Sequence, residues 1–80
     1  MSPHQIQEFE SLARNHMDSL YTRAIQLATN MPQAENLVQD TYLRAYQIFS
    51  SFQQGHDFNT WLLGLLNDTF SSGLKSKYVA

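Results

Sequence analysis

The stretch that decides the fold runs from residue 32 to residue 52 and reads PQAENLVQDTYLRAYQIFSSF. Its apolar side chains recur at steps of one, three and four residues, which is the spacing of one face of an α-helix. These inward positions are Ala34, Leu37, Val38, Thr41, Ala45, Ile48, Phe49 and Phe52. Asn30 with Gln33 three residues later forms a helix cap, and Pro32 suits the first turn of a helix. We therefore expect a helix over residues 32–52.

The segment before this stretch predicts a longer helix. Ser2, Pro3 and Gln5 form a helix start, with a hydroxyl cap, a proline in the first turn and a glutamine three residues after the cap. Steps of three and four residues then link Ile6, Phe9, Ala13, Met17, Leu20, Ala24, Leu27 and Met31. This spacing predicts one amphipathic helix over residues 3–29. His16 lies among its apolar positions, so we interpret it as a packed or boundary histidine.

A third helix is predicted over residues 57–72. Asp57 is a good N-cap, and Gly73 marks the end of the helix. Its inward positions are Phe58, Trp61, Leu62, Leu65, Leu66, Thr69 and Phe70. No stretch of four or more residues alternates between apolar and polar side chains cleanly enough to predict a strand. Three helices with short loops predict an all-α fold, a three-helix antiparallel bundle, as a single domain over residues 1–80.

The composition argues against catalysis. The chain has no cysteine, which excludes disulfides, thiolate metal sites and cysteine nucleophiles. His4, His16 and His56 do not pair at a spacing of three or four residues, and no carboxylate completes a metal-binding set. Asp57 and Asp68 lie about three helical turns apart, which is too far for shared acid–base work. We therefore expect a protein that is not an enzyme and that has no metal and no cofactor.

The polar side of the 32–52 helix is unusual for a solvated surface. By the three-and-four rule it comprises Asn36, Gln39, Asp40, Leu43 and Gln47, with Arg44 beside them. A purely solvated face favours Glu and Lys, whereas this one holds amides, one acid and one arginine around an apolar Leu43. Single exposed leucines are ordinary, and a polar ring around one apolar side chain is also typical of a modest protein interface. The periodicity leaves both interpretations open.

A family resemblance favours the interface. Residues 34–46 read AENLVQDTYLRAY and are followed by Phe49, Phe52 and the run FNTWL at residues 58–62. This resembles region 2 of a bacterial sigma factor of the extracytoplasmic-function (ECF) type, whose pattern is approximately A-E-D-L-V-Q-E-T-F-L-R-A-Y, then F, then F-x-x-W-L. The resemblance covers nearly the whole chain. It includes Gln39 and Arg44, which packing does not demand.

The resemblance implies two binding surfaces. In that family the second helix docks on the clamp coiled coil of the largest subunit of core RNA polymerase. The following loop and the third helix capture the promoter −10 element as single-stranded DNA. The implied polymerase contacts are Asn36, Gln39, Asp40, Leu43, Arg44 and Gln47. The implied DNA contacts are Gln53, Gln54, His56, Asp57, Phe58, Asn59 and Trp61, although Phe58 and Trp61 also suit the core.

The third helix departs from the family pattern. The family typically continues W-L-F-R-I-L-R-N-T, and residues 61–69 here read WLLGLLNDT. Gly64 and Asn67 therefore stand in place of two arginines, and Asp68 stands in place of the asparagine. The outward positions Asp57, Thr60, Gly64, Asn67, Asp68 and Ser71 include no cation, and the net charge of the chain is −2. Because phosphate contacts supply most nucleic-acid affinity, we expect weak binding to the −10 element.

Two alternatives stay open. One is a sigma-like interaction protein, either a decoy or the partner of a split sigma factor, that binds polymerase or a regulator without reading DNA. The other is a helical module unrelated to transcription. We expect no second, −35-reading domain (region 4) in these residues, and an anti-sigma factor is a further candidate partner. No apolar run approaches the ~18 residues of a membrane span, so we expect a cytoplasmic protein with no membrane partner.

Overall fold

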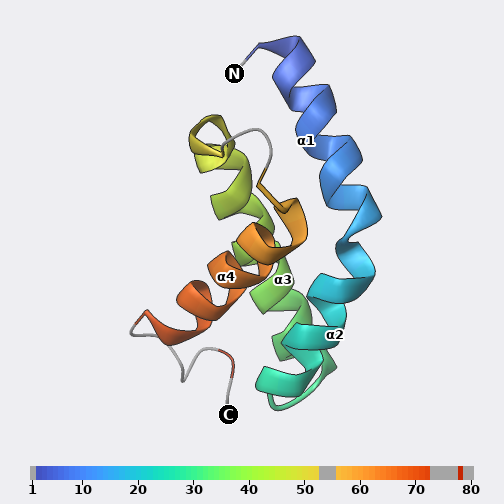
Figure 1. The fold of residues 1–80 in the computed structure, drawn as a ribbon. Helices are drawn as coiled ribbons and strands as arrows, with labels where there is room; N and C mark the ends of the chain where they lie inside the picture. The colour runs from blue at the N-terminus through green and yellow to red at the C-terminus, as the bar shows by residue number, and fades with distance from the viewer. Residues whose placement is uncertain (1, 53–55, 73–77, 79–80) are drawn as a thin grey trace.

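The computed structural model describes residues 2–52, 56–72 and 78. Within these residues the chain forms four α-helices and one short 3₁₀ helix, and it contains no strand. The elements are α1 (Pro3–Asn15), α2 (Met17–Leu27), α3 (Met31–Ile48), η1 (Phe49–Ser51) and α4 (Phe58–Ser71). In Figure 1, α3 returns beside α2 in the opposite direction and α4 crosses α3 at an angle. The all-α prediction is confirmed, whereas the three-helix antiparallel bundle is not.

The predicted helix over residues 3–29 is wrong in one respect, because it is divided at His16. The backbone of His16 is not helical, with φ −119° and ψ 9°. Its N–H donates to the carbonyl of Ala13, three residues back, at 3.0 Å, which is the tighter bond of a 3₁₀ turn. The His16 ring packs against Phe58 with 5.6 Å between ring centroids. The division lets α1 and α2 each bury apolar side chains against the rest of the molecule.

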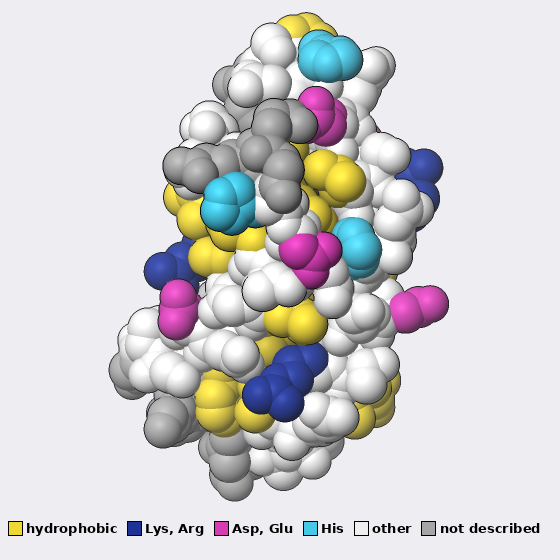
Figure 2. Space-filling view, viewed as in Figure 1, with side chains coloured by type: hydrophobic (Ala, Val, Ile, Leu, Met, Phe, Trp, Pro, Cys, Tyr) yellow, Lys and Arg dark blue, Asp and Glu magenta, His cyan; other side chains and the backbone are white. Residues whose placement is uncertain are grey.

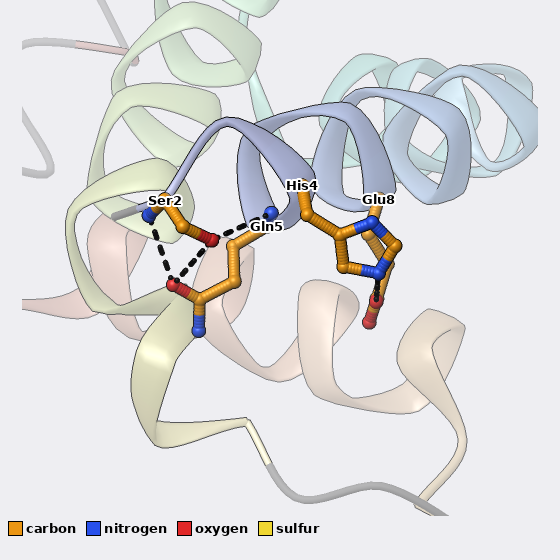
Figure 3. Close-up of polar contacts among 4 residues, drawn as sticks. All are labelled: Ser2, His4, Gln5 and Glu8. Carbon is orange, nitrogen blue, oxygen red and sulfur yellow. Dashed lines mark hydrogen bonds and ion pairs between the residues drawn. The ribbon is translucent and has the colours of Figure 1, made fainter.

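The three predicted helix starts are confirmed. Figure 3 shows the first of them, where Ser2 and Gln5 form a reciprocal pair. The Ser2 hydroxyl accepts from the Gln5 backbone N–H at 3.3 Å, and Gln5 Oε1 accepts from the Ser2 backbone N–H at 3.1 Å. Asn30 Oδ1 caps α3 and Asp57 Oδ2 caps α4, accepting backbone N–H groups at 3.0 and 3.1 Å. These side chains satisfy donors that a helix leaves unpaired at its first turn.

All four α-helices and η1 contribute to one hydrophobic core. Its buried members are Phe9, Ala13, Leu20, Ala24, Ala34, Leu37, Val38, Ala45, Phe49, Phe58, Leu62, Leu65, Leu66 and Tyr78. Thr41 is buried among them and donates to the Leu37 carbonyl at 2.7 Å. Two predicted inward residues, Met31 and Ile48, are instead exposed at the two ends of α3. The helix ends earlier than predicted, since the tighter η1 turn takes over at Phe49.

Candidate functional site

One edge of α3 is open to solvent, and it carries four of the six side chains implied to contact polymerase. The open edge comprises Asn36, Gln39, Leu43 and Gln47, all of them exposed. Leu43 is 60% exposed, the largest value among the exposed large hydrophobic residues. It borders a hollow of about 280 Å³ between α2 and α3, which is lined by Met17, Tyr21, Val38, Gln39, Tyr42 and Leu43. The predicted exposure of Gln39 and Leu43 is confirmed.

The other two side chains, Asp40 and Arg44, lie on the side of α3 that contacts α4 and Tyr78, although Arg44 is itself exposed. Asp40 is half-buried, and its Oδ2 accepts a hydrogen bond from the Tyr78 hydroxyl at 2.6 Å. Arg44 Nη1 donates to Thr69 Oγ1 of α4 at 3.4 Å. The prediction that Asp40 is solvent-exposed is therefore wrong, because the Tyr78 side chain packs against it. The polar side of α3 thus divides into the open edge and an edge that contacts α4 and Tyr78.

Tyr78 joins three parts of the fold. Its side chain is 3% exposed, and its ring stacks on Phe70 of α4 with 6.2 Å between centroids. Its backbone carbonyl accepts from the Thr29 N–H, between α2 and α3, at 3.0 Å. Burial raises the pKa of the Tyr78 hydroxyl far above its ordinary value, and the hydrogen bond to Asp40 raises that pKa further. Periodicity gives no signal for such a residue, since it lies outside the three helices that the sequence predicts.

A second hollow, of about 390 Å³, lies where η1 leads into α4. The aromatic hollow is lined by Ser51, Phe52, His56, Asp57, Thr60 and Trp61. The rings of Phe52 and Trp61 are half-buried and lie 5.1 Å apart between centroids. Phe58 lies 5.5 Å from each of them and is only 4% exposed. Phe58 therefore supports the other two rings from the core, as its alternative assignment to the core predicts.

Of the remaining implied DNA contacts, His56 and Asp57 line the aromatic hollow. His56 and Asp57 are exposed, whereas Asn59 is half-buried. The hydrogen bond from the Thr60 hydroxyl, at 2.6 Å, lowers the pKa of Asp57, and the Thr60 backbone N–H lowers it further. Asn59 Oδ1 is buried without a hydrogen-bond partner among the described residues. Gln53 and Gln54 lie outside the described residues.

The outward face of α4 is as exposed as predicted. Its members are Asp57, Thr60, Gly64, Asn67, Asp68 and Ser71, and every one of them is exposed. Cations reach α4 from other helices, however. Arg23 of α2 donates from Nε to Asn67 Oδ1 at 3.4 Å, and Arg44 of α3 contacts Thr69. Arg23 is absent from the predicted site, because its own helix gives no sign that it reaches α4.

Neither a metal site nor a membrane span is found in the described part of the chain. Among these residues no three His, Asp or Glu side chains come together as a metal-binding group. His4 Nε2 and Glu8 Oε2 form a single pair, 3.9 Å apart on the surface of α1 (Figure 3). No helix in residues 2–52 or 56–72 has the length and apolar character needed to cross a bilayer.

Comparison with known proteins gives one family. The model of the family described as Sigma-70 region 2 matches residues 12–77. The ECF RNA polymerase sigma factor EcfG of Rhodopseudomonas palustris (strain TIE-1) is 39% identical over 59 residues, which are 74% of this chain and 33% of that protein. The ECF RNA polymerase sigma factor SigE of Mycolicibacterium smegmatis (strain ATCC 700084 / mc(2)155) is 32% identical over 62 residues, 78% of this chain and 24% of that protein.

The chain therefore spans a third or less of the length of these two curated relatives. No solved structure gives a significant match.

Proposed function

The chain belongs to the sigma-70 region 2 family, in its ECF branch, and from this membership we propose that it acts in transcription initiation by binding core RNA polymerase. The observation that carries the proposal is the open edge of α3. There Leu43 is 60% exposed within a ring of uncharged amides. The partner is the clamp coiled coil of the largest polymerase subunit. Residues 1–80 act as a single domain, and an anti-sigma factor is a candidate competitor for the same edge.

The chemistry of the open edge suits a protein partner. An interface core is depleted in charge and excludes water around a few apolar side chains. Leu43 with the adjoining 280 Å³ hollow supplies the apolar contact, and it also accommodates an apolar side chain from the partner. Asn36 and Gln39 offer hydrogen-bond donors and acceptors without the desolvation cost of a charge. The open edge therefore docks on a helical surface through one apolar contact and a polar rim.

The second part of the proposal is that the aromatic hollow holds an unpaired base of the −10 element. Stacking of a base on an aromatic ring is worth about 1–3 kcal/mol, and it tolerates any base. Phe52 and Trp61 provide rings at the wall of the hollow, and the exposed His56 and Asp57 provide polar groups. A volume of about 390 Å³ falls in the usual range of small-ligand pockets. The aromatic hollow thereby contributes stacking to the binding of melted promoter DNA.

A charge substitution on α3 tests polymerase binding. Leu43→Lys places a cation at the centre of the open edge and should abolish the capture of core polymerase in a pull-down. Ile48→Lys is the matched control, because Ile48 is also exposed but lies about 140° further around the same helix. Both variants should keep their helical circular dichroism. Equal binding by the two variants would show that the open edge is not the docking surface.

Trp61 gives a direct test of base capture, since it is the only tryptophan in the chain. Its intrinsic fluorescence should be quenched by a single-stranded −10 oligonucleotide and should remain unchanged with the same sequence as a duplex. Unchanged fluorescence when anisotropy shows the oligonucleotide fully bound would place the DNA elsewhere.

One observation favours the alternative of a sigma-like interaction protein. The outward face of α4 supplies no cation of its own. A decoy or a partner of a split sigma factor would bind polymerase and would leave the oligonucleotide unbound at every salt concentration. The two experiments above therefore separate the alternatives.

A further inference from the structure

Arg23 lies where α2 and α4 adjoin, and it is exposed on the surface. Its Nε donates to Asn67 Oδ1 of α4 at 3.4 Å, and its Nη1 donates to Gln26 Oε1 at 3.3 Å. Among the described residues no carboxylate lies within ion-pair distance of Arg23. On the side seen in Figure 2 the dark-blue cationic side chains lie singly rather than in a patch. The charge of Arg23 is thus oriented by two amides but not neutralised.

The orientation of the two amides follows from the chemistry of the guanidinium group. A guanidinium only donates hydrogen bonds, so Asn67 and Gln26 must each present an amide oxygen to it. These two bonds use one N–H on Nε and one on Nη1 of Arg23. A guanidinium has five N–H donors, so three remain for a further acceptor beside the positive charge. A cluster of this kind recognises an anion, and phosphate is the anion that a guanidinium matches best.

We propose that Arg23, Gln26 and Asn67 form a binding site for a backbone phosphate of single-stranded nucleic acid. This inference rests on the proposed function and adds to it a surface that neither helix supplies alone. The cation that α4 lacks at positions 64 and 67 is supplied by α2. Asn67 stands where the family has an arginine. Its side-chain oxygen instead accepts a hydrogen bond from Arg23 of the neighbouring helix α2.

The position of this site relative to the aromatic hollow supports a continuous path for one strand. Thr60 lines the hollow and Asn67 lies seven residues further along α4, which is about 10 Å along the helix axis. Gly64 lies between them on the same exposed face, and apart from the adjacent residues and the backbone of α4 itself no heavy atom lies within 4 Å of the position that a Cβ would occupy there. A strand with a base in the hollow can therefore pass over bare backbone to reach Arg23. The exposed carboxylates of Asp57 and Asp68 lie on the same face and oppose the binding of a phosphate.

The experiment compares two charge-neutralising variants, Arg23→Gln and Arg14→Gln, by fluorescence anisotropy with a labelled single-stranded −10 oligonucleotide. Arg14 is an exposed arginine in the last turn of α1, so both variants remove one positive charge. One lost phosphate contact on a single strand reduces the salt slope by about 0.7, and it weakens binding about fivefold near 0.1 M salt. Arg23→Gln should show both effects on any oligonucleotide sequence, while Arg14→Gln should show neither. Circular dichroism checks that each variant is folded.

Each other outcome overturns the proposal. Equal weakening by the two variants would mean that overall charge, and not a site, attracts the DNA. An unchanged salt slope in Arg23→Gln would remove Arg23 from the DNA surface and would leave base capture at the aromatic hollow intact. If the unmodified domain binds no oligonucleotide at all, the phosphate site does not exist. Polymerase capture in the pull-down then decides separately whether the proposed docking function stands.

Discussion

The open edge of α3 and the outward face of α4 are built in different ways. The open edge consists of side chains from α3 itself, with Leu43 at its centre. The outward face of α4 consists of neutral and acidic side chains, and the nearest arginines come from α2 and α3. The difference teaches that the periodicity of a single helix describes a surface only when that helix supplies the whole of it. Where side chains from neighbouring helices extend over a helix, the residues of that helix alone predict the wrong charge for the surface.

The largest expected effect comes from giving α4 its own cations. Gly64→Arg with Asn67→Arg adds two phosphate contacts, which should strengthen oligonucleotide binding about 25-fold near 0.1 M salt and increase the salt slope by about 1.4. The space over Gly64 is open, so the longer side chain is accommodated. Replacing glycine within the helix should also stabilise α4 by about 1 kcal/mol. Anisotropy titrations at two salt concentrations measure the gain.

A pair of glutamine substitutions at the same positions controls for folding. Gly64→Gln with Asn67→Gln improves the helix without adding charge, so binding should change little and the salt slope should stay the same. If the glutamine variant binds as tightly as the arginine variant, the gain comes from helix stability, and the comparison between the two surfaces fails.

A smaller effect distinguishes the two edges of α3. Tyr78→Phe removes the hydrogen bond to Asp40 and should lower the free energy of unfolding by about 1.5–3 kcal/mol, the usual range for a hydrogen bond to a charged group. Gln39→Ala on the open edge should change it by less than about 0.5 kcal/mol. Urea unfolding followed by circular dichroism measures both. Equal changes in the free energy of unfolding would mean that the hydrogen bond between Tyr78 and Asp40 stabilises the fold no more than an exposed side chain of the open edge does.

The smallest expected effect concerns the helix cap of α4. The hydrogen bonds from Thr60 lower the pKa of Asp57, so its folded-state pKa lies below its unfolded-state pKa. Its contribution to stability is therefore present at pH values above the unfolded-state pKa, and it is lost as pH falls through the folded-state pKa. Asp57→Asn should match the unmodified chain at pH 7, since asparagine caps a helix equally well. Thermal unfolding between pH 5 and pH 2, at about half-unit steps, should be less pH-dependent in the variant.

Most of the local structure could be predicted from the sequence. The caps at Ser2, Asn30 and Asp57 follow from short-range hydrogen bonding, which depends only on residues three positions apart. The buried stripes of α3 and α4 follow from the helical repeat, because one face must be removed from water. The exposure of Leu43 follows from the same repeat.

The features that could not be predicted all depend on distant parts of the chain. The division at His16 separates two helices that pack on different surfaces. The stripe of apolar residues continues across His16 without interruption, so the spacing gives no sign of the division. Tyr78 meets Asp40 across 38 positions, and Arg23 meets Asn67 across 44 positions. Neither pair has a local pattern, because the contact exists only after the helices have packed.

The measurement that tests the account most directly is an NMR titration of backbone amide chemical shifts with two separate ligands. A fragment containing the polymerase clamp coiled coil should shift the amides of Asn36, Gln39 and Leu43. A single-stranded −10 oligonucleotide should instead shift Arg23, Asn67 and the indole N–H of Trp61. Two non-overlapping sets of shifts are the predicted result, because the two surfaces lie on different helices. Shifts of the same residues by both ligands, or shifts at Leu43 with the oligonucleotide alone, would contradict the account.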